Sequence, residues 1–144
     1  MNRSSRIQAV LAMALLIPGT ANIVRADHGG SAGKSSETRL KTRLTGAAID
    51  GKTPEGSAEF RADSRGRTRL EVEVEHVNLK AATVLQVSLQ HGATTTPIGT
   101  ITLDALGNGE LELASQDGDT VPAVQKGDMV TVSNTGTPIL AGVF

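Results

Sequence analysis

The sequence predicts an all-β protein, an antiparallel β-sandwich of seven or eight short strands, with a partly closed β-barrel as the alternative. Apolar and polar residues alternate with a period of two in several segments, turn-forming residues separate those segments, and the expected mature chain offers no ten-residue helix. The clearest segment is residues 69–75, where Leu70, Val72 and Val74 alternate with glutamates. Such alternation is typical of a strand with one buried and one solvated face.

The first 26 residues predict a secretory signal peptide. Arg3 and Arg6 form a positive start, and the run from Ile7 to Ile17 is nearly all apolar before Pro18 ends it. This run is too short for a hydrocarbon core of ~30 Å, so we expect it to be removed rather than kept as a membrane helix.

Cleavage after Ala26 is favoured over cleavage after Ala21, because small residues then occupy both recognition positions. Residues 27–36 would form a flexible Gly/Ser-rich leader, and residues 37–144 a single β-sandwich domain. The expected product is secreted or periplasmic and has no membrane span in the mature chain.

The alternation places the individual strands. It slips by one residue near Glu75 and His76, which predicts a β-bulge or the end of a strand there. The expected strands cover residues 39–44, 58–62, 69–75, 83–90, 98–103, 110–113, 130–133 and 139–144.

Two hairpins are expected, over residues 58–75 and 98–113, because short turns separate their strands. In the first hairpin, pairing Phe60 with Val72 sets Arg61 against Glu71. Unlike charges directly opposite each other stabilise a strand pair, so this register is preferred over one that pairs Phe60 with Leu70.

Composition excludes several partners and sites. The chain has fourteen basic and fifteen acidic side chains, and loss of Arg3, Arg6 and Arg25 with the signal peptide leaves eleven basic ones, a formal charge of −4. With two Phe and no Tyr or Trp, it lacks the stacking surfaces of a nucleic-acid-binding protein, and no nucleic acid is expected as a partner. With no Cys it has neither disulfides nor thiolate metal sites.

Asp117 and Asp119 are the candidate metal ligands, since carboxylate oxygens in a turn are what calcium prefers. Asp104 or Asn108 from a neighbouring turn would complete the set. The spacing matches no calcium loop with a defined ligand series, so a plain turn is the main interpretation and no cofactor is expected.

His76 and His91 would serve a transition metal, although no third ligand accompanies them at motif spacing. Glu71, Glu73 and Glu75 share one strand face and are candidates for acid–base chemistry. Basic residues in the neighbouring segments favour a charge-matched, solvated sheet face instead, so we predict no enzymatic activity.

Taken together, the strand and turn segments resemble short exported bacterial β-proteins that are distantly similar to the chordin-type repeat domain. This resemblance covers about residues 38–144 and implies an immunoglobulin-like β-sandwich with an extracytoplasmic role. It brings no catalytic residues. The segments that carry it are residues 46–49, 70–74, 83–87, 98–101, 107–111 and 118–122.

The functional prediction is an exported, non-catalytic module that acts by contact with a protein or a cell-surface polymer. The alternative is an accessory module that binds calcium or a transition metal. The first interpretation depends on the predicted export, the small single domain and the missing site chemistry.

Export can be tested directly. Expressed with its own N-terminus, the protein should appear outside the cytoplasm with Asp27 or Asn22 as its first residue, because a signal peptidase removes the apolar segment. N-terminal sequencing provides the measurement. Recovery of Met1 in a membrane fraction would contradict the prediction.

Overall fold

The computed structural model describes residues 36–144, so the predicted signal peptide and residues 27–35 of the predicted leader lie outside the described residues. All of the described residues belong to one compact unit. No helix in this part of the chain is long and apolar enough to cross a membrane. The elements are β1 (Thr38–Thr45), β2 (Glu55–Ala62), β3 (Thr68–Glu75), β4 (Val84–His91), β5 (Thr94–Thr102), β6 (Gly109–Ala114), the 3₁₀ helix η1 (Ser115–Asp117), β7 (Met129–Asn134) and β8 (Thr137–Val143).

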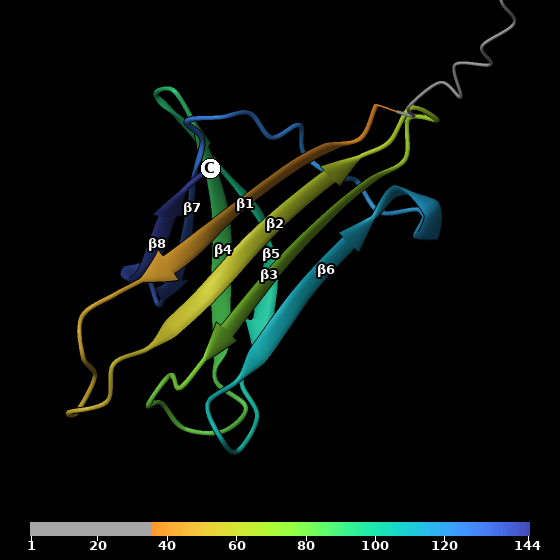
Figure 1. Ribbon diagram of the computed structural model, residues 1–144. Coiled ribbons are helices and arrows are strands. Elements are labelled where there is room, and N and C mark those ends of the chain that lie inside the picture. Colours follow the sequence, from red (N-terminus) through yellow and green to blue (C-terminus); the bar gives the residue numbers. More distant parts are fainter. Residues whose placement is uncertain (1–35) are drawn as a thin grey trace, which may run out of the picture. The chain divides into compact units, whose positions relative to one another are not determined.

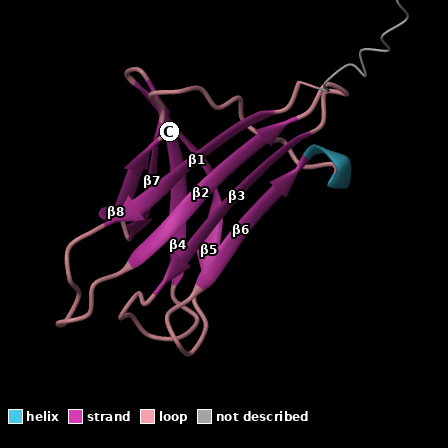
Figure 2. Cartoon of the chain, viewed as in Figure 1, coloured by secondary structure: helices cyan, strands magenta, loops and turns pink. Residues whose placement is uncertain are grey.

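These strands form one antiparallel sheet in the order β5-β4-β7-β8-β1-β2-β3-β6, nearly closed into a barrel. The single turn of η1 is the only helix among residues 36–144 (Figure 2). The predicted all-β class, with a sandwich or a partly closed barrel as its architecture, is confirmed.

The sheet consists of two four-stranded halves, β1-β2-β3-β6 and β5-β4-β7-β8. In Figure 1 the first half lies across the near side, and β4 and β5 pass behind it. The halves join where Thr45 of β1 pairs with Ala141 of β8, the one register position that these two strands share. A Cβ atom at Gly46 would lie 1.8 Å from the carbonyl oxygen of Ile139, so this close approach of two backbones requires glycine.

The core fills the space between the two halves. In β3, Leu70, Val72 and Val74 are fully buried while the intervening glutamates are not, as their alternation predicts. Leu40, Leu111 and Leu113 are partly buried and pack against this core. The buried apolar residues are Leu44, Ala58, Phe60, Leu70, Val72, Val74, Val77, Leu85, Val87, Leu89, Ile101, Leu103, Ala114, Val124, Val130, Val132 and Leu140.

The hairpin predicted for residues 98–113 is wrong. β5 and β6 lie at opposite ends of the strand order, where β5 pairs with β4 and β6 pairs with β3. β6 joins β3 because the two strands match in apolar alternation, with Leu111 opposite Val72 and Leu113 opposite Leu70. A Cβ atom at Gly99 of β5 would lie 2.8 Å from the Leu111 methyl carbons, so β5 and β6 meet through side chains and leave the barrel incompletely closed.

The hairpin of β2 and β3 forms, but its predicted register is wrong. Phe60 pairs with Leu70, which sets Glu59 against Glu71 and leaves Val72 opposite Ala58. The turn between β2 and β3 decides this register. The Asp63 side chain binds the backbone of the turn and does not pair with a residue of β3. Its carboxylate accepts hydrogen bonds from the backbone N–H groups of residues 65 and 67, at 2.9 and 3.0 Å.

Candidate functional site

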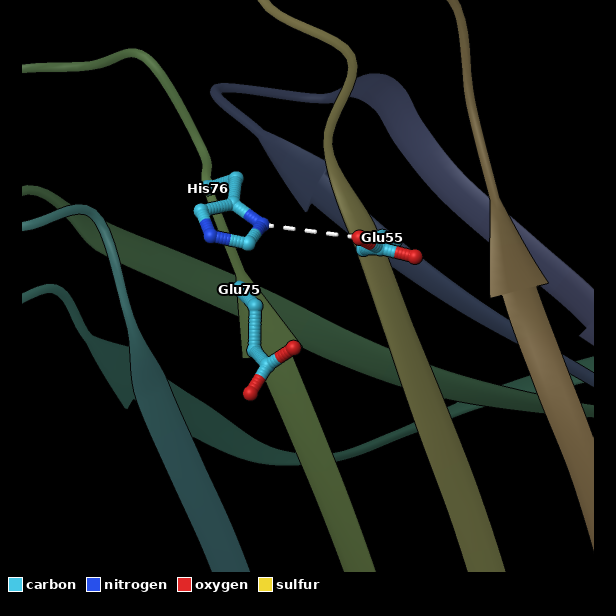
Figure 3. A group of neighbouring side chains, drawn as sticks. All are labelled: Glu55, Glu75 and His76. Atoms are coloured by element: carbon cyan, nitrogen blue, oxygen red, sulfur yellow. Dashed lines mark ion pairs between the residues drawn. The ribbon is translucent and has the colours of Figure 1, made fainter.

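The end of β3 brings together an imidazole and two carboxylates. Successive side chains of a strand normally point to opposite faces. His76 directly follows the last residue of β3 and has a φ of 57°, the left-handed conformation that is uncommon for residues other than glycine. The change of backbone direction places its ring beside Glu55 and Glu75, which are directly opposite each other in β2 and β3 (Figure 3). The strand end predicted near Glu75 and His76 is confirmed.

We call Glu55, Glu75 and His76 the β3-end cluster. One ligand atom from each lies within 4.8 Å of the others, and this is the only such group of three among residues 36–144. The Nδ1 atom of His76 is 3.5 Å from Oε1 of Glu55. Arg43 lies 2.6 Å from the other oxygen of Glu55, so a cation already shares one of the two carboxylates. Glu75 and His76 are exposed and Glu55 is half-buried, so a metal ion bound here could also be reached by water.

The β5–β6 turn holds the cluster in place. The side-chain oxygen of Asn108 accepts a hydrogen bond of 3.2 Å from the backbone N–H of His76, and the N–H of Val77 donates to the carbonyl of Gly107 at 2.9 Å. In the same turn, Asp104 accepts hydrogen bonds from backbone N–H groups, chiefly that of Asn108, and they lower its pKa. Asp104 and Asn108 thus stabilise the turn and support His76 rather than joining Asp117 and Asp119.

Asp117 and Asp119, the predicted calcium ligands, lie after β6. Asp117 ends η1 and is exposed. Asp119 accepts a hydrogen bond of 3.0 Å from the N–H of Ala114 and returns one of 3.2 Å from its own N–H to the carbonyl of Ala114. Its carboxylate therefore closes a turn, and within residues 36–144 neither aspartate belongs to a group of three candidate ligands. Calcium binding here stays a prediction.

His91, the other predicted transition-metal ligand, belongs to a different site from His76. Its Nδ1 atom lies 2.7 Å from the Asp128 carboxylate, which is only 3% exposed and is the one buried charged residue in residues 36–144. The second oxygen of Asp128 accepts a hydrogen bond of 2.8 Å from the N–H of Gln125. The Asp128 backbone binds Phe144, since the Phe144 N–H donates to its carbonyl at 2.9 Å. This pair therefore anchors the last strand and the loop before β7.

The outward side chains of β1, β2, β3 and β6 form a surface that we call the charged face. Its charged side chains form rows that run across the strands, because the observed register often places residues of like charge opposite each other. Arg39, Arg61 and Arg69 are directly opposite one another in β1, β2 and β3, and we call them the arginine row. Like charges directly opposite each other destabilise a sheet, so this row needs compensation. The rows below it are Lys41, Glu59, Glu71 and Glu112, then Arg43, Ser57, Glu73 and Glu110.

Compensation comes from ion pairs across and along the strands that a comparison of directly opposite residues in β2 and β3 leaves out. Glu59 pairs with Arg39 at 2.9 Å, with Lys41 at 3.6 Å, and with Arg61 of its own strand. The hydrogen bond from Arg39, together with the one from Arg61 and the nearby positive charge, lowers the pKa of Glu59 to about 2. Arg69 similarly lies 3.1 Å from Glu71 and 2.9 Å from Glu112.

Sequence reasoning found His76 and Glu75 but did not join them to Glu55. The slip in alternation at Glu75 and His76 marked the place where the ring leaves the strand pattern. The partner Glu55 could not be identified from it, because that pairing depends on the register of β2 against β3, which was predicted wrongly. The arginine row was missed for the same reason.

No family model matches the chain, and no curated protein does, so the interpretation of the site depends on its geometry. The resemblance of residues 38–144 to the chordin-type repeat domain therefore stays a prediction.

Glu59 should make stability depend on pH in acid. Its pKa is lower in the folded chain than the ordinary 4.5, so its stabilising contribution is complete above about pH 4.5 and is lost as the pH falls toward 2. Glu59→Gln should be less stable at pH 7, by on the order of 1 kcal/mol after solvent screening, and should lose less stability between pH 5 and 2. Denaturant unfolding at each pH measures this.

The matched control is Glu110→Gln. Glu110 lies on the same face, opposite Glu73, and makes no ion pair within residues 36–144. It should keep the acid dependence of the unaltered protein. Equal pH profiles for the two variants would contradict the role given to Glu59.

Proposed function

We propose that this protein is an exported, non-catalytic β-module, secreted or periplasmic, that acts by contact with a protein or a cell-surface polymer. The N-terminal sequence pattern supports export. The charged face supports contact, because it presents side chains from four adjacent strands on one open surface of the sheet. The role proposed is not catalysis, because the acid–base candidates Glu71, Glu73 and Glu75 lie on the open face of a sheet, and Glu71 is paired with Arg69 at 3.1 Å.

One observation carries this proposal: charge is segregated across the charged face. β1 and β2 together carry four cations and two carboxylates on this face, whereas β3 and β6 together carry one arginine and five glutamates. A surface with separated positive and negative halves steers and orients a charged partner. The residues are Arg39, Lys41, Arg43, Arg61, Glu55 and Glu59 on the first half, and Arg69, Glu71, Glu73, Glu75, Glu110 and Glu112 on the second.

Co-sedimentation with the envelope fraction of the producing cell tests this function. Ser57→Trp places a bulky side chain at the centre of the charged face and should lower the bound fraction whatever the partner's charge. Ser88→Trp is the matched control, because Ser88 holds an outward position in β4 of the other half. Protease treatment of the envelope distinguishes a protein partner from a polymer. No binding, or equal binding by both variants, would contradict contact through this face.

A second candidate function is metal binding. The β3-end cluster is a better candidate site for a metal than the predicted ligands Asp117 and Asp119, because it brings three ligand atoms together. An imidazole nitrogen and two carboxylates form a mixed nitrogen and oxygen ligand set, which suits zinc and related transition metals better than calcium. Three protein ligands would leave a coordination position for water or for a partner's side chain. In this version the module binds a metal at Glu55, Glu75 and His76.

Thermal unfolding with EDTA and then with zinc tests the second function. A metal that binds only the folded state, at 100 times its dissociation constant, adds about 2.7 kcal/mol. This gain should raise the midpoint by roughly ten degrees or more for a domain of this size. His76→Ala should abolish the shift and His91→Ala should keep it. A zinc shift that survives His76→Ala would rule out the cluster, and a calcium shift lost with Asp117→Ala and Asp119→Ala would favour the turn instead.

A further inference from the structure

The arginine row is a line of regularly spaced guanidinium groups. Arg39, Arg61 and Arg69 occupy the same row of three adjacent strands, and adjacent strands lie about 4.8 Å apart. Their side chains are 55%, 50% and 47% exposed, so each reaches solvent from a rigid strand. The row therefore runs across the sheet rather than along one strand.

The carboxylates of the protein hold these guanidinium groups without occupying all of their donors. Arg39 uses its Nη2 atom toward Glu59, Arg61 uses Nε toward the same residue, and Arg69 uses Nη2. A guanidinium carries five N–H donors in a planar fork that fits a carboxylate or sulfate group. In the contacts within residues 36–144, each group thus keeps two nitrogens for a ligand. Fixing the side chains beforehand lowers the entropy cost of binding.

The basic side chains at this end outnumber the nearby acids by one. The basic residues are Arg39, Lys41, Arg61, Arg65, Arg67 and Arg69, and the acids are Glu37, Glu59, Asp63, Glu71 and Glu112. Glu59 alone serves Arg39, Arg61 and Lys41. Beyond the row, the β2–β3 turn adds two arginines; Arg67 is paired with Asp63, whereas Arg65 has no ion pair within residues 36–144. A shallow hollow of about 250 Å³ lies against the row; Arg61, Arg67 and Arg69 line it together with the acids Glu37 and Asp63.

We propose that the arginine row binds the carboxylate or sulfate groups of an acidic polysaccharide. This inference rests on the proposed function and names the partner of the charged face. A polymer that repeats its anionic groups would engage successive arginines, and several weak contacts on one chain add to a useful affinity.

The composition of the surface favours a polysaccharide over the other polyanions. Protein interfaces have an apolar or aromatic centre, whereas the large exposed apolar residues of residues 36–144 are Val84, Leu106 and Val143, none of them in β1, β2 or β3. Single-stranded nucleic acids are bound on aromatic stacking surfaces, but Phe60 is buried and Phe144 is partly buried against the core. A hydrophilic polyanion needs only the charge and the donors that the row provides.

Binding of the full chain to dextran sulfate and to alginate, with neutral dextran as the blank, tests the inference. Affinity should fall as salt rises, because charged contacts are screened. Changing Arg39, Arg61 and Arg69 together to Gln should weaken binding at least about tenfold, since a hydrogen bond to a charged group is worth about 1.5 kcal/mol or more. Lysines at the same positions keep the charge but lose the fork, so they should restore only part of the affinity.

The matched control changes Lys52, Lys80 and Lys126 to Gln, which removes the same charge from positions outside the charged face. It should leave binding unchanged. If the triple arginine variant does not fold, the single change Arg61→Gln, at a half-exposed side chain, replaces it. Two results would overturn the inference. One is an equal loss of affinity in the triple arginine-to-Gln variant and in the triple lysine-to-Gln control; the other is tighter binding of poly-glutamate or duplex DNA than of the polysaccharides. Envelope binding that is sensitive to Ser57→Trp would then still support the proposed function.

Discussion

The pairing of β2 with β3 is the constraint on which the surface of this protein depends. Phe60 faces Leu70, and both are buried in a core shared by the two halves of the sheet. Because side chains alternate with a period of two, the same register also decides which charges meet on the other face. The core and the turn at Asp63 set the register, and this register places like charges opposite one another on the exposed face. Ion pairs of Glu59 and Arg69, some diagonal between strands and some along one strand, offset the repulsion within those rows.

The two halves of the sheet differ in how firmly they are connected. β1 and β8 share one paired position, Thr45 with Ala141, and close approach there requires glycine at Gly46 and Gly142. β5 and β6 are not paired in the sheet; the Leu111 side chain lies against Gly99, and Gly109 lies close to the backbone of Thr102. Few backbone hydrogen bonds cross either seam, and regions with few such bonds open at lower free energy than a continuous ladder.

The end of β3 shows how a local break in a pattern creates a chemical site. His76 leaves the strand in a left-handed conformation and is held there by Asn108 from a turn 32 residues later. A non-glycine residue in this conformation costs energy that surrounding contacts must offset. The result is an imidazole on the same side of the sheet as Glu55 and Glu75. At the opposite end of the charged face lies the arginine row, so the two ends of one face carry side-chain groups of different charge.

The sequence by itself determined the all-β class, the approximate positions of the strands, the buried positions of Leu70, Val72 and Val74, and the break after Glu75. These follow from the period of two, which each strand records locally. Tertiary structure alone decided the register of β2 against β3 and the neighbour of β6. β6 lies beside β3 rather than β5, and Phe60 faces Leu70, because burial and turn geometry outweigh charge pairs worth at most ~1 kcal/mol on an exposed face. The β3-end cluster and the arginine row both depend on that pairing, so no local pattern could have revealed them.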